Sequence, residues 1–406
     1  MTIGIAEIVL LGLIADWLFR RLRIPGLVGM LLVGVLVGPY VLGWIDPDLL
    51  DLSPDLRLIA LVVILLRAGF ELGREVLFRV GVRALLLAFF PAVVEGAAIV
   101  LLGPPLLGLT YLESALLGAI VAAVSPAVVV PMMIDFIQRG KGAAKGIPTM
   151  VLAAASVDDV FVIVVFSVLM GFLTGRQVGI VWKLAGIPLS IVSGIAVGIA
   201  VGLLLHRLFL RTDPRATKRV MVVIALSFLL VRLEHWVAAW IPFSALIAAM
   251  AIGFAMLEKS PPMAREIAAK LGKVWVLMEI VLFAMVGAQV NISVAWDAGP
   301  AGAALIGIGL IARGIGVLIC LIGGDLDWGE RLFVVVSYSP KATVQAAIGA
   351  SPLLAMRMAG LPEAPGEIIL AVAVLSIVLT APVGAWATAA IGERVLRTTS
   401  GAEPVP

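Results

Sequence analysis

The chain has 406 residues, of which 62% are hydrophobic and 14% are charged, and its formal net charge is +3. A soluble globular protein is nearer half apolar and a quarter charged, whereas this chain repeats apolar runs of about 20 residues from end to end. The composition excludes a soluble catalytic domain or a nucleic-acid-binding protein and predicts an all-α polytopic membrane protein. A single cysteine, Cys320, excludes a disulfide framework within the chain.

Thirteen membrane spans are predicted from the apolar runs. They cover roughly residues 3–19, 25–44, 57–73, 82–102, 112–137, 146–171, 186–206, 219–238, 241–258, 274–294, 301–323, 331–351 and 367–392. No basic segment precedes the first run, and three arginines follow it. We therefore expect a retained first helix with its N-terminus outside, rather than a cleaved signal peptide.

Lysine and arginine are distributed unevenly between alternate loops. Of the 29 such residues, 21 fall in odd-numbered loops or after the last span and four in even-numbered loops; four lie at membrane depth, namely Arg67, Arg232, Arg313 and Lys341. Because basic loops stay on the cytoplasmic side, we expect a cytoplasmic C-terminus and an inner (plasma) membrane location. The chain has no P-loop, no dinucleotide-binding glycine motif and no ATPase cassette, so solute movement must draw on gradients or passive flow.

Two adjacent carboxylates, Asp158 and Asp159, lie near the middle of the sixth span. A charge at the bilayer centre costs roughly 2.5–3.5 kcal/mol on insertion scales, so the pair indicates function more than structure. Neighbouring helix positions point about 100° apart, so the two carboxylates are not equivalent. Burial and mutual repulsion favour protonation, and carboxylate oxygens suit hard monovalent cations. The pair therefore predicts a site where a proton and a cation compete.

A weak internal repeat relates the fifth and twelfth spans. Ser125-Pro126 in the fifth is similar to Ser339-Pro340 in the twelfth. Proline removes a helical hydrogen bond, so we predict interruptions at Pro126, Pro131 and Pro340. The two motifs lie seven spans apart, which gives the repeats opposite orientations. Paired broken helices in inverted repeats indicate a transport site near the membrane midplane.

Further polar residues accompany the predicted breaks. Lys341 follows Pro340, and we expect it to compensate helix-end dipoles or to titrate as an amine, with snorkelling to an interface as the alternative. Ser125, Thr343 and Gln345 are expected to lend oxygens or hydrogen bonds at the crossing, although small polar residues also join membrane helices without further function.

Glu95 in the fourth span and Arg313 in the eleventh are buried charges of opposite sign. They occupy corresponding places in the two repeats. We therefore predict an ion pair with a mainly structural role, and direct participation in transport is the alternative.

These motifs resemble the cation/proton antiporter superfamily and, within it, the paired-aspartate NHA-type sodium/proton antiporters. The segment from Ser156 to Val160, which holds Asp158 and Asp159, is similar to the signature pair that follows the first broken helix. The segment from Pro340 to Gly349 resembles the signature of the second broken helix. The likeness covers essentially the whole order of spans.

The resemblance implies inverted repeats with crossing broken helices, and an elevator-like movement of a core domain against a dimerisation domain. The core would comprise residues of approximately 80–171 and 301–395, and the scaffold approximately 1–79 and 186–295, in a homodimer. It implies that Asp159 is the main carrier of Na⁺ or Li⁺ and of protons, that Asp158 assists, and that Ser156 supports the crossing. No cofactor is implied.

The same resemblance places Arg313 where related antiporters have a lysine paired with the first aspartate, with Glu95 as its partner here. Whether Arg313 pairs with Glu95 or with Asp158 stays open at this stage. One departure is Gln289, which stands where relatives often carry an acidic residue and puts an auxiliary pH-sensing role there in doubt.

The sequence therefore predicts a secondary active transporter, not an enzyme, that exchanges Na⁺ or Li⁺ for H⁺ in pH and sodium homeostasis. A K⁺/H⁺ antiporter of the same superfamily is the nearest alternative, and an ion channel is a weaker one. An intramembrane aspartyl protease needs two facing carboxylates that share a proton, whereas Asp158 and Asp159 diverge around one helix.

Overall fold

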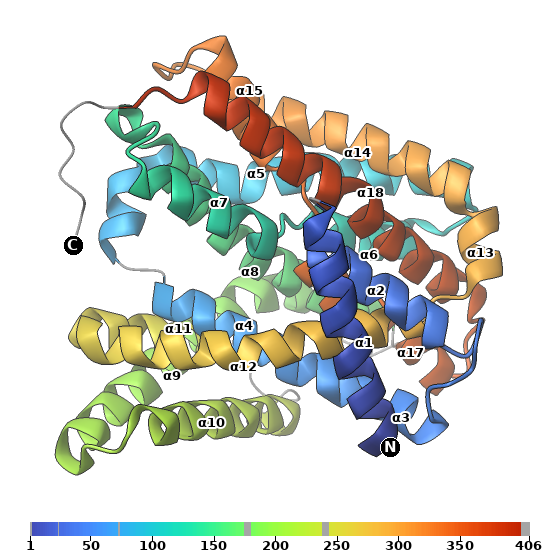
Figure 1. Ribbon diagram of the computed structural model, residues 1–406, viewed down its shortest axis with the longest axis horizontal. Coiled ribbons are helices and arrows are strands. Elements are labelled where there is room, and N and C mark those ends of the chain that lie inside the picture. Colours follow the sequence, from blue (N-terminus) through green and yellow to red (C-terminus); the bar gives the residue numbers. More distant parts are fainter. Residues whose placement is uncertain (1, 23, 72–73, 174–179, 238–242, 399–406) are drawn as a thin grey trace. The chain divides into compact units, whose positions relative to one another are not determined.

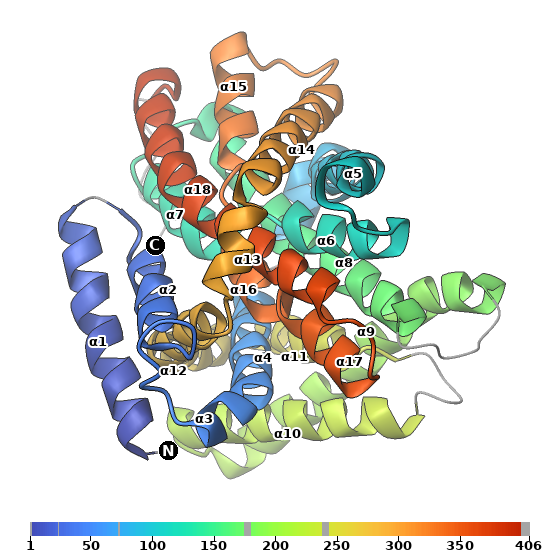
Figure 2. The same ribbon diagram turned by 90° about the vertical axis from the view of Figure 1, so that its right-hand side faces the viewer.

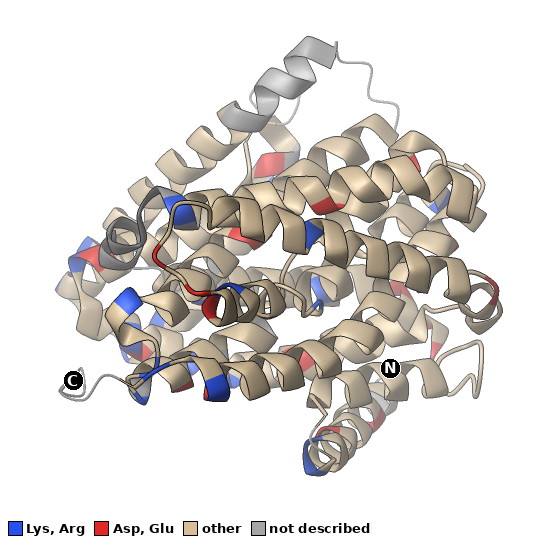
Figure 3. Ribbon diagram, turned by 90° about the horizontal axis from the view of Figure 1, so that it is seen from above, with Lys and Arg blue, Asp and Glu red and all other residues tan. Residues whose placement is uncertain are grey.

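The computed structural model describes residues 2–22, 24–71, 74–173, 180–237 and 243–398. Within these ranges the chain is helical, apart from turns and one isolated β-bridge between Lys141 and Thr398. Six of the described helices are long and apolar enough to cross a bilayer, and three shorter apolar helices accompany them. Figure 3 shows how sparsely acidic and basic residues are distributed over the described helices. The all-α membrane fold class is confirmed, and the count of thirteen spans stays a prediction.

The chain divides into two compact units. The first comprises residues 1–53, 79–175 and 283–406. Most of its residues lie in helices (Figures 1 and 2), namely α1 (Thr2–Arg21), α2 (Gly26–Val37), α3 (Pro47–Asp51), α5 (Arg74–Leu107), α6 (Tyr111–Ala122), α7 (Pro126–Gln138), α8 (Ile147–Leu173), α13 (Ile292–Asp297), α14 (Gly299–Cys320), α15 (Trp328–Ser337), α16 (Thr343–Ile348), α17 (Ser351–Met358) and α18 (Ala364–Val395). A single 3₁₀ turn, η1 (Ala143–Lys145), joins α7 to α8.

The second unit comprises residues 54–78 and 176–282. It contains α4 (Ser53–Glu71), α9 (Ile180–Thr212), α10 (Ala216–Val237), α11 (Ala245–Lys259) and most of α12 (Pro261–Ala288). The closest packing in it joins α9 to α11, where a Cβ at Gly198 would lie 2.3 Å from the carbonyl oxygen of Ala248. Small residues at such a contact allow two helix backbones to touch, as membrane helices commonly do.

The first broken helix is the pair α6 and α7. A capping box between Thr110 and Glu113 begins α6, which ends at Ala122, and α7 begins with Pro126 at its first position. Proline is tolerated there because its missing N–H is not needed, and it pushes the preceding residue towards extended backbone. The break before Pro126 is confirmed. The predicted interruption at Pro131 is wrong: α7 runs through it and gives up a single hydrogen bond there.

The second broken helix is the pair α15 and α16. A capping box between Asp327 and Glu330 begins α15, which ends at Ser337, and α16 does not begin until Thr343. The predicted break at Pro340 is therefore confirmed. The facing helix α18 makes room for the break, because a Cβ at Gly384 would lie 2.7 Å from Cγ of Pro340.

Several of the expected spans have different bounds, and the second and the tenth are examples. The second was expected to reach residue 44, but α2 ends at Val37, because Gly38 turns extended and Pro39 follows it. The tenth was expected at 274–294, but α12 begins at Pro261 and ends at Ala288. The apolar run in the sequence did not indicate the first half of α12, because charged residues interrupt it there.

A buried apolar cluster surrounds the first break. It joins residues of α5, α7, α8, α14 and α15 with Val124 and Tyr338, one residue from each break. Phe136 and Phe333 meet edge to face within it, with ring centroids 5.7 Å apart. The irregular backbone is thus buried in protein rather than exposed to lipid, which is the condition for its survival at membrane depth.

Candidate ion-binding site

The two breaks touch each other. The backbone N–H of Ser125 donates a hydrogen bond of 2.8 Å to the carbonyl oxygen of Pro340. The amide nitrogen of Gln345, on α16, donates to the carbonyl oxygens of Ile120 and Ala123 at 3.0 and 2.9 Å. The last carbonyls of a helix lack partners of their own. A side chain from the second broken helix therefore donates to carbonyl oxygens at the C-terminal end of α6.

Asp158 is held from two sides. It lies on α8 and is fully buried. Its Oδ2 accepts a 2.7 Å hydrogen bond from the backbone N–H of Val124 in the first break, and its Oδ1 accepts a 3.1 Å hydrogen bond from Nη2 of Arg313 on α14. Hydrogen bonds in which one partner is charged are the strong ones, so these two contacts fix the position of the Asp158 carboxylate.

Arg313 answers the question that the sequence left open, because it pairs with both carboxylates. Its Nη1 donates to Oε2 of Glu95 at 2.6 Å and also to the carbonyl oxygen of Ala122, while its Nη2 binds Asp158. The guanidinium lies 5.5 Å from the ring centroid of Tyr338. The predicted pair of Glu95 and Arg313 is present, and it is part of a larger network.

Lys341 extends this network from the second break. Its Nζ donates to Oε2 of Glu95 at 2.7 Å, and its backbone N–H donates to Oγ1 of Thr380 on α18 at 2.9 Å. The Thr380 hydroxyl in turn donates to the carbonyl oxygen of Ser376 at 2.7 Å. Lys341 is fully buried, so it does not snorkel to an interface in this structure. Its ammonium and the guanidinium of Arg313 share one carboxylate oxygen.

Asp159 stands apart from this network. It is 7% exposed, against 0% for Asp158, and its Oδ1 has no hydrogen-bond partner among the described residues. Arg313 and Lys341 pair with Glu95 and Asp158, so Asp159 leaves one negative charge in excess when all five groups are ionised. A buried charge without a partner is strongly unfavourable, so the arrangement favours uptake of one positive charge.

Other buried oxygens at the crossing also lack partners. Oγ of Ser125, Oγ1 of Thr343 and Oε1 of Gln345 have no hydrogen-bond partner among the described residues. Such groups are expected to find partners when a ligand or water is bound. Ser156 belongs to α8, but its side chain lies outside the described residues. No group of three or more His, Cys, Asp or Glu that would hold a multivalent metal occurs in the described part of the chain.

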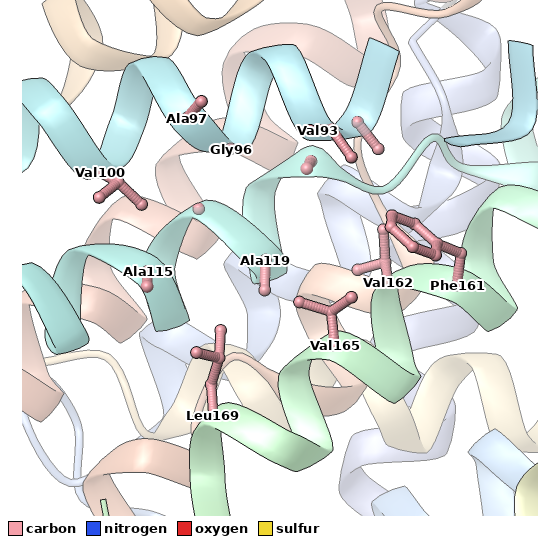
Figure 4. Close-up of a pocket in the computed structure, with 13 residues that line it drawn as sticks. Val93, Gly96, Ala97, Val100, Ala115, Ala119, Phe161, Val162, Val165 and Leu169 are labelled. Atoms are coloured by element: carbon pink, nitrogen blue, oxygen red, sulfur yellow. The ribbon is translucent and has the colours of Figure 1, made fainter. Parts of the chain in front are cut away.

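An apolar cavity of about 330 Å³ lies beside the network, between α5, α6 and α8 (Figure 4). Figure 4 shows Ala119, Val162 and Val165 around it, and all of its side chains are apolar. Gly96 and Ala122, next to the charged network, also line it. Because it offers no side-chain oxygen, this cavity is not where a cation would be coordinated.

Sequence reasoning missed three parts of the site. Tyr338 and Thr380 resemble many other polar residues in apolar spans, so no pattern singled them out. The backbone N–H of Val124 cannot be recognised from any side-chain pattern, although the carboxylates of the next span suggested a need for donors. Gln289, the departure noted above, donates a 2.6 Å hydrogen bond to Oγ of Ser53 and does not reach the network.

The chain is similar in sequence to known sodium/hydrogen exchangers. A family model described as "Sodium/hydrogen exchanger, transmembrane" matches residues 7–392. Sodium/hydrogen exchanger 9B2 of Homo sapiens is 33% identical over 386 residues, which cover 92% of this chain and 70% of the relative. Sodium/hydrogen exchanger 9B1 of Homo sapiens is 28% identical over 384 residues, which cover 92% of this chain and 73% of the relative.

A solved structure shows the same fold. The sodium proton antiporter MjNhaP1 from Methanocaldococcus jannaschii superposes with a TM-score of 0.83 over 96% of this chain and 97% of its own, at 20% sequence identity. Exchangers are transporters rather than enzymes. With a matching family model over nearly its full length, this multi-pass membrane protein belongs to the sodium/hydrogen exchanger family.

Proposed function

We propose that the protein is a secondary active antiporter that exchanges Na⁺ or Li⁺ for H⁺ at Asp159, with Asp158 in an assisting role. The observation that carries this proposal is the contrast between the two carboxylates. Asp158 is engaged by Arg313 and by the Val124 N–H, whereas Oδ1 of Asp159 has no partner among the described residues. A carrier must release its ion, and a carboxylate already held by a guanidinium is the weaker candidate.

Competition for one carboxylate couples the two ions. A hard monovalent cation prefers oxygen ligands, and a carboxylate binds either it or a proton. We expect the side-chain oxygens of Ser125 and Thr343, which have no hydrogen-bond partner in the described part of the chain, to help coordinate the cation. Exchange then requires only that Asp159 releases a proton on one side of the membrane and Na⁺ on the other.

The charge balance supports a one-for-one exchange. With Glu95, Asp158, Arg313 and Lys341 all ionised, the network other than Asp159 is neutral. One Na⁺ or one H⁺ at Asp159 then makes the whole site neutral. Both loaded states thus carry the same charge through the membrane, and transport moves no net charge.

The movement itself would be elevator-like. The broken helices α6–α7 and α15–α16, with α5, α8, α14 and α18, would form the core domain, approximately residues 80–171 and 301–395. Approximately residues 1–79 and 186–295 would form the scaffold of a homodimer. The concentration of basic residues in alternate loops supports an N-terminus outside and a C-terminus in the cytoplasm of an inner (plasma) membrane. Neither a nucleic acid nor a cofactor has a part in this scheme.

The names of the relatives favour sodium over potassium and exchange over passive flow. The curated relatives are called sodium/hydrogen exchangers, and the structural neighbour is called a sodium proton antiporter. A K⁺/H⁺ antiporter or an ion channel is accordingly not favoured for this chain.

The test is transport in proteoliposomes that carry an acidic interior and an internal pH dye. Addition of Na⁺ or Li⁺ outside should dissipate the gradient, and equal K⁺ should not. The rate should stay the same when valinomycin and K⁺ clamp the membrane potential at different values. Absence of a response to Na⁺ and Li⁺ would refute the exchange, and a rate that follows the potential would refute the one-for-one charge balance.

A further inference from the structure

A second pocket of about 370 Å³ lies between α14 and α15, on another side of Arg313. Its walls are mainly apolar and include Leu310, Leu318 and Val335, and Arg313 and Tyr338 also line it. Pockets for small molecules have this volume and this composition, with apolar walls and a few polar groups. The cavity of Figure 4 differs, because its lining side chains are all apolar.

Two buried donors of this pocket have no partner among the described residues. Arg313 is 1% exposed and Tyr338 is 0% exposed, and both Nε of Arg313 and Oη of Tyr338 lack hydrogen bonds there. The other polar residue of the lining, Ser339, already donates its hydroxyl to the carbonyl oxygen of Val336 at 2.7 Å. Buried donors are normally satisfied, so this pair calls for an acceptor.

The charge of the surroundings selects the kind of acceptor. The other nitrogens of Arg313 already bind Glu95 and Asp158, and with Asp159 the group carries one negative charge in excess. An anionic ligand would add to that excess in a low-dielectric setting, whereas a neutral oxygen acceptor would not. Ile311 and Ile315, which also line the pocket, are 67% and 51% exposed on helix α14. Exposed isoleucines on an apolar membrane helix are typical of a lipid-facing surface, so we expect entry from the bilayer.

We propose that this pocket binds a neutral, lipid-soluble molecule whose carbonyl oxygen accepts hydrogen bonds from Nε of Arg313 and Oη of Tyr338. Its apolar body lies against Leu310, Leu318 and Val335. The ligand would contact the same guanidinium that holds Asp158, and any effect on exchange rests on the proposed function. Binding itself does not.

Benzophenone tests this site directly, because it is a neutral ketone that labels nearby C–H bonds under near-ultraviolet light. The purified full-length protein in liposomes is labelled and its peptides are identified by mass spectrometry. The label should appear within residues 310–318 or 335–339. Excess ethyl octanoate, a neutral ester, should compete with it, and undecane, which lacks an acceptor, should not.

Matched variants separate the donors from the apolar walls. Tyr338→Phe keeps the ring against Arg313 and removes one donor, so labelling should fall about fivefold, as expected for one neutral hydrogen bond. Leu318→Trp should abolish labelling by filling the pocket, while Ile319→Trp, on the same helix but outside the lining, should leave it unchanged. Labelling elsewhere, equal competition by undecane, or unchanged labelling of Tyr338→Phe would overturn the proposal. These readouts need no transport, so they can fail while exchange is intact.

Discussion

The two breaks occupy corresponding places in the chain but carry different chemistry. The first, residues 123–125, has no charged side chain, and the buried N–H of Val124 donates to the carboxylate of Asp158. The second, residues 338–342, contains Lys341, whose N–H is satisfied by the neutral hydroxyl of Thr380 and whose ammonium binds Glu95. The charged group at the first break, Asp158, thus comes from another helix, whereas the second break contains its own charged residue, Lys341.

The charged residues of the site are therefore distributed unevenly between the two breaks. Both cations, Arg313 and Lys341, lie in the second half of the chain, and the three carboxylates Glu95, Asp158 and Asp159 lie in the first half. The ion pairs therefore join helices of the two halves of the chain. The following variants test each side of the contrast, beginning with the largest expected effect.

Lys341→Met should be the most damaging change at the second break. It leaves Glu95 with Arg313 alone in a buried setting, and loss of one partner from a buried pair lowers the free energy of unfolding by roughly 3–5 kcal/mol. Ser125→Ala at the first break should change it by less than about 1 kcal/mol, because its hydroxyl has no partner among the described residues. Thermal unfolding in detergent measures both.

The matched control restores the charge balance. The double variant Lys341→Met with Glu95→Gln removes one charge of each sign, so it should recover much of the lost stability. Equal melting of Lys341→Met and the wild type would show that the lysine is not an essential partner of Glu95.

A charge swap of Glu95 and Arg313 should fail to restore stability, although the pair exists. The swap would place a carboxylate against Asp158 and a guanidinium against Lys341, since Arg313 also binds Asp158 and Glu95 also binds Lys341. Recovery of wild-type melting by the swapped protein would contradict the shared network and favour an isolated pair.

Gln345→Leu should lower the free energy of unfolding by about 1–3 kcal/mol, because the carbonyl oxygens of Ile120 and Ala123 lose a buried donor. Gln345→Glu has nearly the same shape and should be worse at neutral pH, since it would place a carboxylate against those carbonyls. Thermal unfolding of both variants against wild type checks this order. A milder effect for Gln345→Glu would contradict the donor role of the amide.

The smallest effect concerns the bridge that ties the loop after α7 to the end of α18. Nη2 of Arg139 lies 2.5 Å from Oε1 of Glu393, and Nζ of Lys141 also binds this carboxylate. Hydrogen bonds from Arg139 and Lys141 hold the pKa of Glu393 below its usual value. A carboxyl with a lowered pKa in the folded state stabilises the fold above its unfolded pKa of about 4.3 and loses this as pH falls through the folded pKa.

Glu393→Gln should therefore melt slightly below wild type at pH 7, and the difference should disappear as the pH falls below about 4. The effect is small because the pair is partly exposed to solvent. Melting curves of the two proteins across this pH range test it. A difference that is independent of pH would assign the effect to packing of the side chain instead of its charge.

The sequence predicted the charged parts of the site because charges are rare in apolar spans. Glu95, Arg313 and Lys341 stood out against the background, and proline marked both breaks. What it did not predict depends on three-dimensional contact: the stacking of Tyr338, the hydroxyl of Thr380, and the double pairing of Arg313. Helix bounds were wrong where hydropathy and helix formation diverge, as in the charged first half of α12 and at Pro131, which α7 tolerates.

The central claim is that Asp159 alternately holds the proton and the sodium ion. The most direct measurement is ²²Na⁺ uptake into proteoliposomes with an acidic interior, for wild type, Asp159→Asn and the control Asp135→Asn, which removes an exposed carboxylate of α7. We expect uptake in wild type and in Asp135→Asn, and none above protein-free liposomes in Asp159→Asn. Uptake by folded Asp159→Asn at the wild-type rate would contradict it.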